Sequence, residues 1–249
     1  MRISQSPGYK QALKLLQERT DPILLDIGCC CSYYYIPCLF FFFFGNLILF
    51  LPVGTDIRKA VVDGWPVSKV LASDLRQGFW DCGHELFKST PATFPAAFIP
   101  GDIFDPAILS LSPLSCTTDC NNPTNPTPAL SSLTSLTPLQ HRISAIHASS
   151  FFHLFNEEKQ LELAKRLATI LTLEKGSIIF GQHGSRPENR GIPGEMFCHS
   201  PETWEKLWTE EVFGPDQKVR VKVDTRLTEW EGQMENEKGW VLSWCVEVL

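Results

Sequence analysis

The sequence predicts a doubly wound α/β domain, and three observations support this prediction. Short apolar runs, typical of buried parallel strands, alternate with amphipathic helical segments over most of the chain. Several of these runs end in a glycine or an acidic residue, where a strand would lead into a turn. Two segments of alternating residues close the chain and predict a final strand pair. This order of elements is typical of one sheet with helices on both faces.

The first half of the chain is predicted to contain three strands and three helices. Asp21-Pro22 ends the first helix, and Gly28 follows the first strand in a tight turn. The second and third strands each end in an acid, Asp74 and Asp102. The expected elements are a helix over 9–18, a strand over 23–27, a helix over 55–62, a strand over 69–74, a helix over 77–87 and a strand over 96–102.

The second half begins with residues 106–140, which are rich in Ser, Thr, Pro and Asn. This composition predicts a low-complexity loop without secondary structure. Helix signals are clear further on, because Asn156 is a good N-cap and Ser200-Pro201 places a cap before a proline at the first helical position. The expected elements are a strand over 142–148, a helix over 156–171, a strand over 176–181, a helix over 203–212, and strands over 218–229 and 239–249.

Length and composition predict a single globular domain over residues 1–249. Of the 249 residues, 43% are hydrophobic and 20% are charged. The net charge of −6, without a Lys/Arg-rich run, argues against a nucleic-acid or membrane partner. Residues 1–20 lack the apolar core of a signal peptide, so we expect a cytoplasmic protein.

The cysteine pattern predicts reduced, structural thiols. The nine cysteines are an odd number and include no CxxC pair. Cys116 and Cys120 lie close together, but in a Pro/Thr/Asn-rich stretch without a partner histidine. Because no group of residues has the spacing of metal ligands, we expect no metal ion.

Residues 32–53 form an anomalous segment, because these 22 residues carry no charge and include five consecutive phenylalanines, Phe40–Phe44. A transmembrane span fits the length, but it would separate the first strand from the helix after Gly54. A buried hairpin conflicts with the phenylalanine run, which lacks strand alternation. We favour a retained intron or gene-model error, since Phe, Leu and Tyr codons are rich in the pyrimidines common at intron ends.

Asp26, Gly28 and Gly54 indicate the chemistry of the site. A strand, a glycine turn and a helix N-terminus suit a nucleotide-like ligand, because glycine lets the backbone approach and the helix offers free N–H groups. An acid at the end of the next strand accepts hydrogen bonds from ribose hydroxyls. Gly28 and Asp74 lie 46 positions apart, but only 24 without the uncharged residues, which is close to the roughly 20 expected.

Four further motifs follow predicted strands or precede the last predicted helix. They are Ser73-Asp74-Leu75, Gly101-Asp102-Ile103, HASSFFHLF at 147–155 and GEMFCHSP at 194–201. With the glycine turn, they resemble the class I S-adenosylmethionine-dependent methyltransferases and, more narrowly, the fungal O-methyltransferases of meroterpenoid biosynthesis. The resemblance runs from Tyr9 onward, outside 32–53 and 106–140. It implies a Rossmann-like, mostly parallel seven-stranded sheet with an antiparallel C-terminal strand pair, and a homodimer.

The resemblance also implies S-adenosylmethionine as the cofactor, bound at the strand ends. The turn that Asp26 opens, with Gly28 and Gly54, would flank the methionine end of the cofactor. Asp74 and Leu75 would hold the ribose. Asp102, with Ile103, would place a carboxylate and a backbone N–H by the adenine. The implied cofactor-binding residues are Asp26, Gly28, Gly54, Asp74, Leu75, Asp102 and Ile103.

By the same resemblance, the acceptor is a carboxyl or hydroxyl group of a small polyketide or terpenoid intermediate. A carboxylate needs no base at neutral pH, whereas a hydroxyl does. His147 and His153, which follow the fourth predicted strand, are the candidate bases. For His153, a packed structural role is an equal alternative. Five aromatic residues are candidates for an acceptor pocket, with core packing as the alternative: Trp80, Phe151, Phe152, Phe155 and Trp204.

Two other functions stay open at this point. An NAD(P)-binding Rossmann enzyme begins with the same strand and turn, although a GxGxxG motif is absent from the sequence. A catalytically impaired or membrane-tethered methyltransferase-like binding protein would result if residues 32–53 belong to the chain, because they interrupt the glycine turn.

Overall fold

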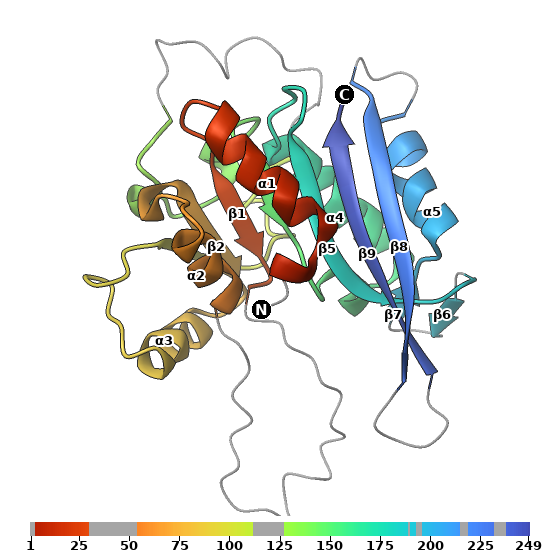
Figure 1. Ribbon diagram of the computed structural model, residues 1–249, viewed down its shortest axis with the longest axis horizontal. Coiled ribbons are helices and arrows are strands. Elements are labelled where there is room, and N and C mark those ends of the chain that lie inside the picture. Colours follow the sequence, from red (N-terminus) through yellow and green to blue (C-terminus); the bar gives the residue numbers. More distant parts are fainter. Residues whose placement is uncertain are drawn as a thin grey trace, which may run out of the picture.

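The structure is a computed structural model that describes residues 3–29, 54–111, 127–188, 190–192, 196–214, 219–231 and 238–249. Within these ranges, seven strands form one sheet in the order β3-β2-β1-β4-β5-β9-β8. Strands β1 to β5 are parallel, and β9 pairs antiparallel with both β5 and β8 (Figure 1). The predicted doubly wound α/β fold with an antiparallel terminal pair is therefore confirmed.

The elements of the first half agree with prediction to within a few residues at each end. Strands β1 and β2 are buried along their whole length, which explains why they are continuous apolar runs without alternation. The first helix begins at Pro7, a residue suited to the first helical turn. The elements are α1 (Pro7–Glu18), β1 (Leu24–Ile27), α2 (Thr55–Val62), β2 (Val70–Asp74), α3 (Gln77–Leu86) and β3 (Ala97–Pro100).

The second half also follows prediction at its capped helices. The Asn156 side chain accepts a hydrogen bond from the Lys159 N–H at 2.9 Å, and Ser200 and Thr203 form a reciprocal capping box. The elements are β4 (Ala145–His147), α4 (Glu157–Ile170), β5 (Ile178–Ser185), α5 (Pro201–Lys206), β8 (Val221–Glu231) and β9 (Lys238–Val248).

The helix predicted over 203–212 is present, but its second half is a π-helix. Helix α5 ends at Lys206, and Leu207–Val212 continues as a π-helical turn, η7. The Phe213 N–H donates to the Trp208 carbonyl, five residues back, at 2.9 Å. The wider turn accompanies the burial of two large rings, Trp204 and Trp208, on the same side. Packing therefore overrides the helical pattern.

The loop predicted over 106–140 also needs correction. Its described residues include two 3₁₀ turns, η4 (Leu130–Ser132) and η5 (Thr137–Leu139). Leu130, Leu136 and Leu139 are buried in the core and anchor this segment, although their spacing has no helical or strand period. Residues 112–126, with Cys116 and Cys120, and the 32–53 segment lie outside the described residues.

Five short elements were not predicted, because three residues are too few to show a period. They are the 3₁₀ turns η1 (Ile3–Gln5), η3 (Val67–Lys69) and η6 (Phe152–Leu154), and the hairpin strands β6 (Arg190–Ile192) and β7 (Met196–Cys198).

Two apolar clusters cover the two faces of the sheet. Helices α1, α2 and α3 bury Tyr9, Ile57 and Trp80 against one face. Helices α4 and α5 bury Leu163 and Trp204 against the other. Core packing is thus the role of Trp80, Phe151, Phe152 and Trp204, while Phe155 is partly buried against the same core. No helix in the described part of the chain is long and apolar enough to cross a membrane.

Candidate cofactor-binding site

The predicted site residues lie at or after the ends of parallel strands or at the start of α2, and these strands end at one edge of the sheet (Figure 1). Strand pairing aligns Asp26 of β1 with His147 of β4, and Asp74 of β2 with Pro100 of β3. Because these four strands run in the same direction, the turns that follow them share that edge. Open parallel sheets bind their ligands there.

Gly28 and Gly54 shape the turn between β1 and α2. Both have left-handed backbones, with φ of 67° and 65°. A Cβ atom at Gly28 would lie 2.6 Å from the Phe151 ring, and one at Gly54 would lie 2.7 Å from the Trp80 ring. Only glycine fits both requirements, and both glycines are buried where the turn leads into the first N–H groups of α2.

Asp26 is a buried acid with one oxygen occupied. Its exposed fraction is 1%, and its Oδ1 lies 2.7 Å from His147 Nδ1. Its Oδ2 has no hydrogen-bond partner among the described residues. Burial raises the pKa of Asp26, and the contact with His147 opposes this rise. A buried carboxylate oxygen without a donor favours a ligand that brings a cation or an N–H group.

Other acids surround Asp26. After burial, the charges of Asp56 and Asp74 add to the rise in the Asp26 pKa. Asp56 lies in the first turn of α2 and was not predicted to belong to the site. Its Oδ1 accepts a hydrogen bond from the Ile3 N–H at 3.1 Å. The aspartates at 26, 56 and 74 make this edge of the sheet attractive to a positively charged ligand.

The other predicted cofactor residues follow β2 and β3. Asp74 is 6% exposed, and its Oδ1 accepts a hydrogen bond from the Leu75 N–H at 2.7 Å. Leu75 itself is exposed. After β3, the exposed Asp102 accepts from the Phe104 N–H at 2.9 Å, while the Ile103 side chain is buried in the core. The predicted contact of Ile103 with a ligand would therefore be made by its backbone.

The candidate base His147 is held on both ring nitrogens. Its Nε2 lies 2.8 Å from Ser149 Oγ, and the Ser149 Oγ accepts a hydrogen bond from the Gln182 N–H at 3.3 Å. His147 is 1% exposed and Ser149 6%. Ser149 belongs to the HASSFFHLF motif, but no role was predicted for it. The role of His147 as a base stays a prediction.

His153, the second candidate base, lies near two buried histidines. The His183 Nδ1 accepts a hydrogen bond from the Trp244 Nε1 at 3.0 Å, and His199 Nδ1 contacts Thr203 Oγ1 at 3.0 Å. Burial lowers the pKa of His199 to about 4, and burial and then His153 lower the pKa of His183. His153 is half-buried beside them, and its role as a base also stays a prediction.

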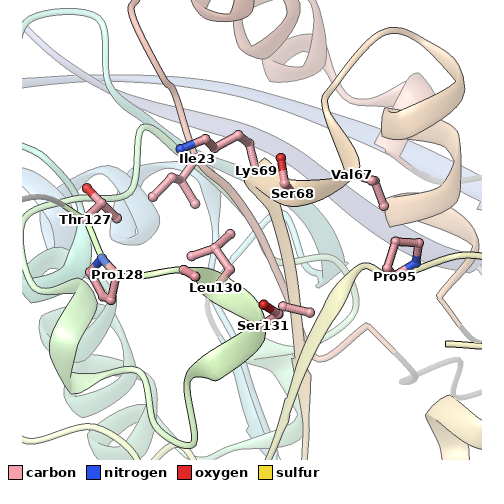
Figure 2. A pocket seen from close by; sticks show the side chains of 11 residues that line it. Ile23, Val67, Ser68, Lys69, Pro95, Thr127, Pro128, Leu130 and Ser131 are labelled. Carbon is pink, nitrogen blue, oxygen red and sulfur yellow. The ribbon is translucent and has the colours of Figure 1, made fainter. Parts of the chain in front are cut away.

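A cavity of about 390 Å³ lies at the opposite edge of the sheet. Figure 2 shows Ile23, Lys69 and Leu130 lining it, with Thr127 and Ser131 nearby. Ile23 and Lys69 precede strands β1 and β2, so this cavity is separate from the turns that carry the predicted cofactor residues.

The described residues contain no group of three or more histidine, cysteine or acidic side chains placed to hold a metal ion. The cysteines among them, Cys29, Cys82, Cys198 and Cys245, form no disulfide bond with one another.

Comparison with known proteins confirms the predicted resemblance. No model of a known protein family matches the chain. The fungal O-methyltransferase phiE is 28% identical over 212 residues, covering 82% of this chain and 53% of phiE. The asnovolin E/chermesin D methyltransferase nvfJ of Aspergillus novofumigatus is 23% identical and covers 88% of this chain and 63% of nvfJ. The O-methyltransferase atr3 of Stereocaulon alpinum is 26% identical, and the match covers 98% of this chain and 56% of atr3. The chain thus spans less than two thirds of the length of these relatives.

Solved structures share the fold. A structure from work on the conversion of a disulfide bond into a thioacetal group during echinomycin biosynthesis is 14% identical, with a TM-score of 0.50 over 98% of this chain and 80% of that chain. A LepI variant in complex with SAH and a substrate analogue is 13% identical, with a TM-score of 0.50 over 100% of this chain and 49% of that chain. At these identities the likeness extends to the fold alone.

Proposed function

We propose that this relative of the fungal O-methyltransferases is itself an S-adenosylmethionine-dependent methyltransferase of secondary metabolism. The observation that supports this most is the buried Asp26 oxygen beside the glycine turn, which has no donor among the described residues. The relatives phiE and nvfJ carry methyltransferase names, and the sheet order matches the architecture that the resemblance implies.

The residues present fit the cofactor. S-adenosylmethionine supplies a methyl group on a positively charged sulfur, and the acids at this edge suit a cation. Asp26 would take the amino-acid end, beside the turn of Gly28 and Gly54, and Asp74 with Leu75 would hold the ribose. Asp102 and the Ile103 backbone would lie by the adenine.

The proposed acceptor is a carboxyl group of a polyketide-derived or terpenoid intermediate. An acceptor oxygen attacks the methyl carbon, an O–C bond forms, and the C–S electron pair stays on sulfur, which becomes a neutral thioether. A carboxylate is already deprotonated at neutral pH, so the protein's task is to position and desolvate the two groups. Both ring nitrogens of His147 are engaged, which fits an acceptor that needs no base.

A hydroxyl acceptor would need a base, and His153 is then the better placed candidate because it is partly exposed. The two acceptor classes differ in their pH dependence. For a carboxylate, the rate should be flat between pH 6 and 8, whereas a histidine base would give a rising limb in that range.

The activity is tested by incubating the protein with S-adenosylmethionine that carries a labelled methyl group and with candidate carboxylic acids. Mass spectrometry should detect the labelled methyl group on the acid. NADH binding without S-adenosylmethionine binding would contradict the proposal in favour of an NAD(P)-binding enzyme.

We further propose that residues 1–249 form one domain that residues 32–53 interrupt. The Gly54 N–H donates to the Cys29 carbonyl at 3.3 Å, although 25 positions separate the two residues. Without residues 32–53, Gly54 would stand three positions after Cys29, with only Cys30 and Cys31 between. An N–H bonded to a carbonyl three positions back is the hydrogen bond of a β-turn.

This proposal is tested on the transcript. A message that lacks the codons of 32–53 would support a gene-model error, and one that still encodes Phe40–Phe44 would contradict it. In the latter case, a catalytically impaired or membrane-tethered binding protein becomes the favoured function, because the interrupted turn belongs to the cofactor site. The homodimer and the cytoplasmic location also stay predictions.

A further inference from the structure

A chain of buried hydrogen bonds crosses three neighbouring strands beneath the glycine turn. Asp26 Oδ1 on β1 contacts His147 Nδ1 on β4 at 2.7 Å, and His147 Nε2 contacts Ser149 Oγ at 2.8 Å. The chain ends on β5, where the Gln182 N–H donates to Ser149 Oγ at 3.3 Å. Exposed fractions of 1% for Asp26 and His147 and 6% for Ser149 keep water from replacing these contacts.

The hydrogen-bonding roles follow from the end of the chain at Asp26. An ionised carboxylate only accepts, so the proton of the neutral His147 ring is on Nδ1, which donates to Asp26 Oδ1. Nε2 then accepts from the Ser149 hydroxyl, whose oxygen accepts in turn from the Gln182 N–H. His147 therefore directs its proton toward Asp26 rather than taking one from a substrate.

We propose that His147 is a positioning residue that orients the Asp26 carboxylate, so that Oδ2 receives the ammonium group of the cofactor's amino-acid end. The inference rests on the proposed function and replaces the role of His147 as a base. It follows from the two oxygens of one carboxylate: His147 holds Oδ1, and Oδ2 is buried without a donor among the described residues. Ser149 and Gln182 fix the ring that makes the contact, which ties the glycine turn to strands β4 and β5.

Two ligands separate this role from general support of the fold. S-adenosylhomocysteine contains the amino-acid end, whereas 5′-methylthioadenosine has the same nucleoside and thioether without it. We would measure binding of both by calorimetry to the full chain and to His147→Phe, His147→Asn, Asp26→Asn and Asp74→Ala. Retained binding of 5′-methylthioadenosine shows that the His147 and Asp26 variants are folded, and thermal unfolding shows this for Asp74→Ala.

His147→Phe should weaken S-adenosylhomocysteine binding roughly 10- to 100-fold, as expected for a lost hydrogen bond to a charged group, and leave 5′-methylthioadenosine within about twofold. Asp26→Asn should also weaken S-adenosylhomocysteine binding alone. The double variant, with His147→Phe and Asp26→Asn together, should lose little more affinity than either single variant, because both changes remove the same interaction. His147→Asn, whose amide can still donate toward Asp26, should restore most of the affinity. Asp74→Ala, at the ribose, should weaken both ligands alike.

Equal losses for the two ligands in His147→Phe would overturn the proposal, because they would indicate structural support only. Unchanged binding of S-adenosylhomocysteine would also overturn it. If the unaltered chain and a chain without residues 32–53 bind neither ligand, the proposed function fails, and the inference fails with it. Additive losses in the double variant would show that His147 does not act through Asp26.

Discussion

At the scale of single residues, the turn after β1 depends on two backbones that only glycine adopts easily. Gly28 and Gly54 have positive φ, and each lies against an aromatic ring that a Cβ atom would strike. The sequence indicated these glycines as the approach to a ligand. The rings behind them, Phe151 and Trp80, come from distant segments, so no local pattern could identify them.

Gly28→Ala should therefore destabilise the protein. The left-handed backbone costs an alanine about 1–2 kcal/mol, and the contact 2.6 Å from Phe151 adds to this loss. Urea unfolding measures the change in the free energy of unfolding. Gly78→Ala is the matched control, because a Cβ there meets nothing within 4 Å, and it should be neutral or stabilising by up to about 1 kcal/mol. Equal stabilities of the two variants would contradict this account of the turn.

Asp74→Ala should lower the affinity for S-adenosylhomocysteine. Loss of a hydrogen bond from a carboxylate to the ribose corresponds to about 1.5–3 kcal/mol, or roughly 10- to 100-fold in the dissociation constant. Calorimetry measures this, with Asp81→Ala on the exposed surface of α3 as the control. An affinity equal to that of the unaltered chain would show that Asp74 does not hold the ribose.

At the scale of elements, the central parallel strands β1 and β2 were predicted best because they are buried on both faces and are therefore continuous apolar runs. Helices α4 and α5 were recognised by their caps, Asn156 and Ser200. The π-helical turn η7 and the turns around Leu130 and Leu139 depend on tertiary packing, which leaves no periodic signal. For the same reason, the sequence suggested Asp26 and His147 but not their contact, since 121 positions separate them.

Two buried histidines, His183 on β5 and His199 just before α5, predict that the folded protein loses stability in acid. His199 has a pKa near 4 in the folded protein, because burial disfavours its charged form, against an ordinary value of about 6.5. Above pH 6.5 the imidazole is neutral in both states and does not affect stability. As pH falls from about 6.5 toward 4, only the unfolded chain takes up the proton, and stability drops by up to about 3 kcal/mol. Burial lowers the pKa of His183 as well, so His183 should add to this loss of stability.

Unfolding free energies from pH 7.5 to 4.5 test this prediction. His199→Asn serves as the comparison, because it removes the titrating ring while leaving the other acids and histidines in place. The difference in stability between the two proteins should shift in favour of the variant as pH falls below 6.5. If the unfolding free energies of the two proteins change with pH in parallel, the pKa of His199 is not depressed.

At the scale of the whole molecule, the fold brings residues from four strand ends to one edge, and residues 32–53 fall within the first of these turns. Deleting 32–53 should preserve the Cys29–Gly54 hydrogen bond as that of a β-turn. We therefore expect the deletion variant to be at least as stable as the full chain and to bind S-adenosylhomocysteine more tightly.

A one-residue shift of the deletion provides the control. Removing 33–53 instead leaves three residues between Cys29 and Gly54, which breaks the β-turn spacing, so this variant should bind less tightly than the first. Thermal unfolding and calorimetry compare the two. If both variants unfold earlier than the full chain, residues 32–53 are a required part of the domain.

The most direct test of the methyltransferase assignment is calorimetric titration of the 32–53 deletion variant with S-adenosylmethionine and, separately, with NADH. The acids at the strand ends and the Asp26 oxygen, which has no donor within the described ranges, predict saturable binding of S-adenosylmethionine that Asp74→Ala weakens, and no binding of NADH. Saturable binding of NADH without binding of S-adenosylmethionine would contradict the assignment.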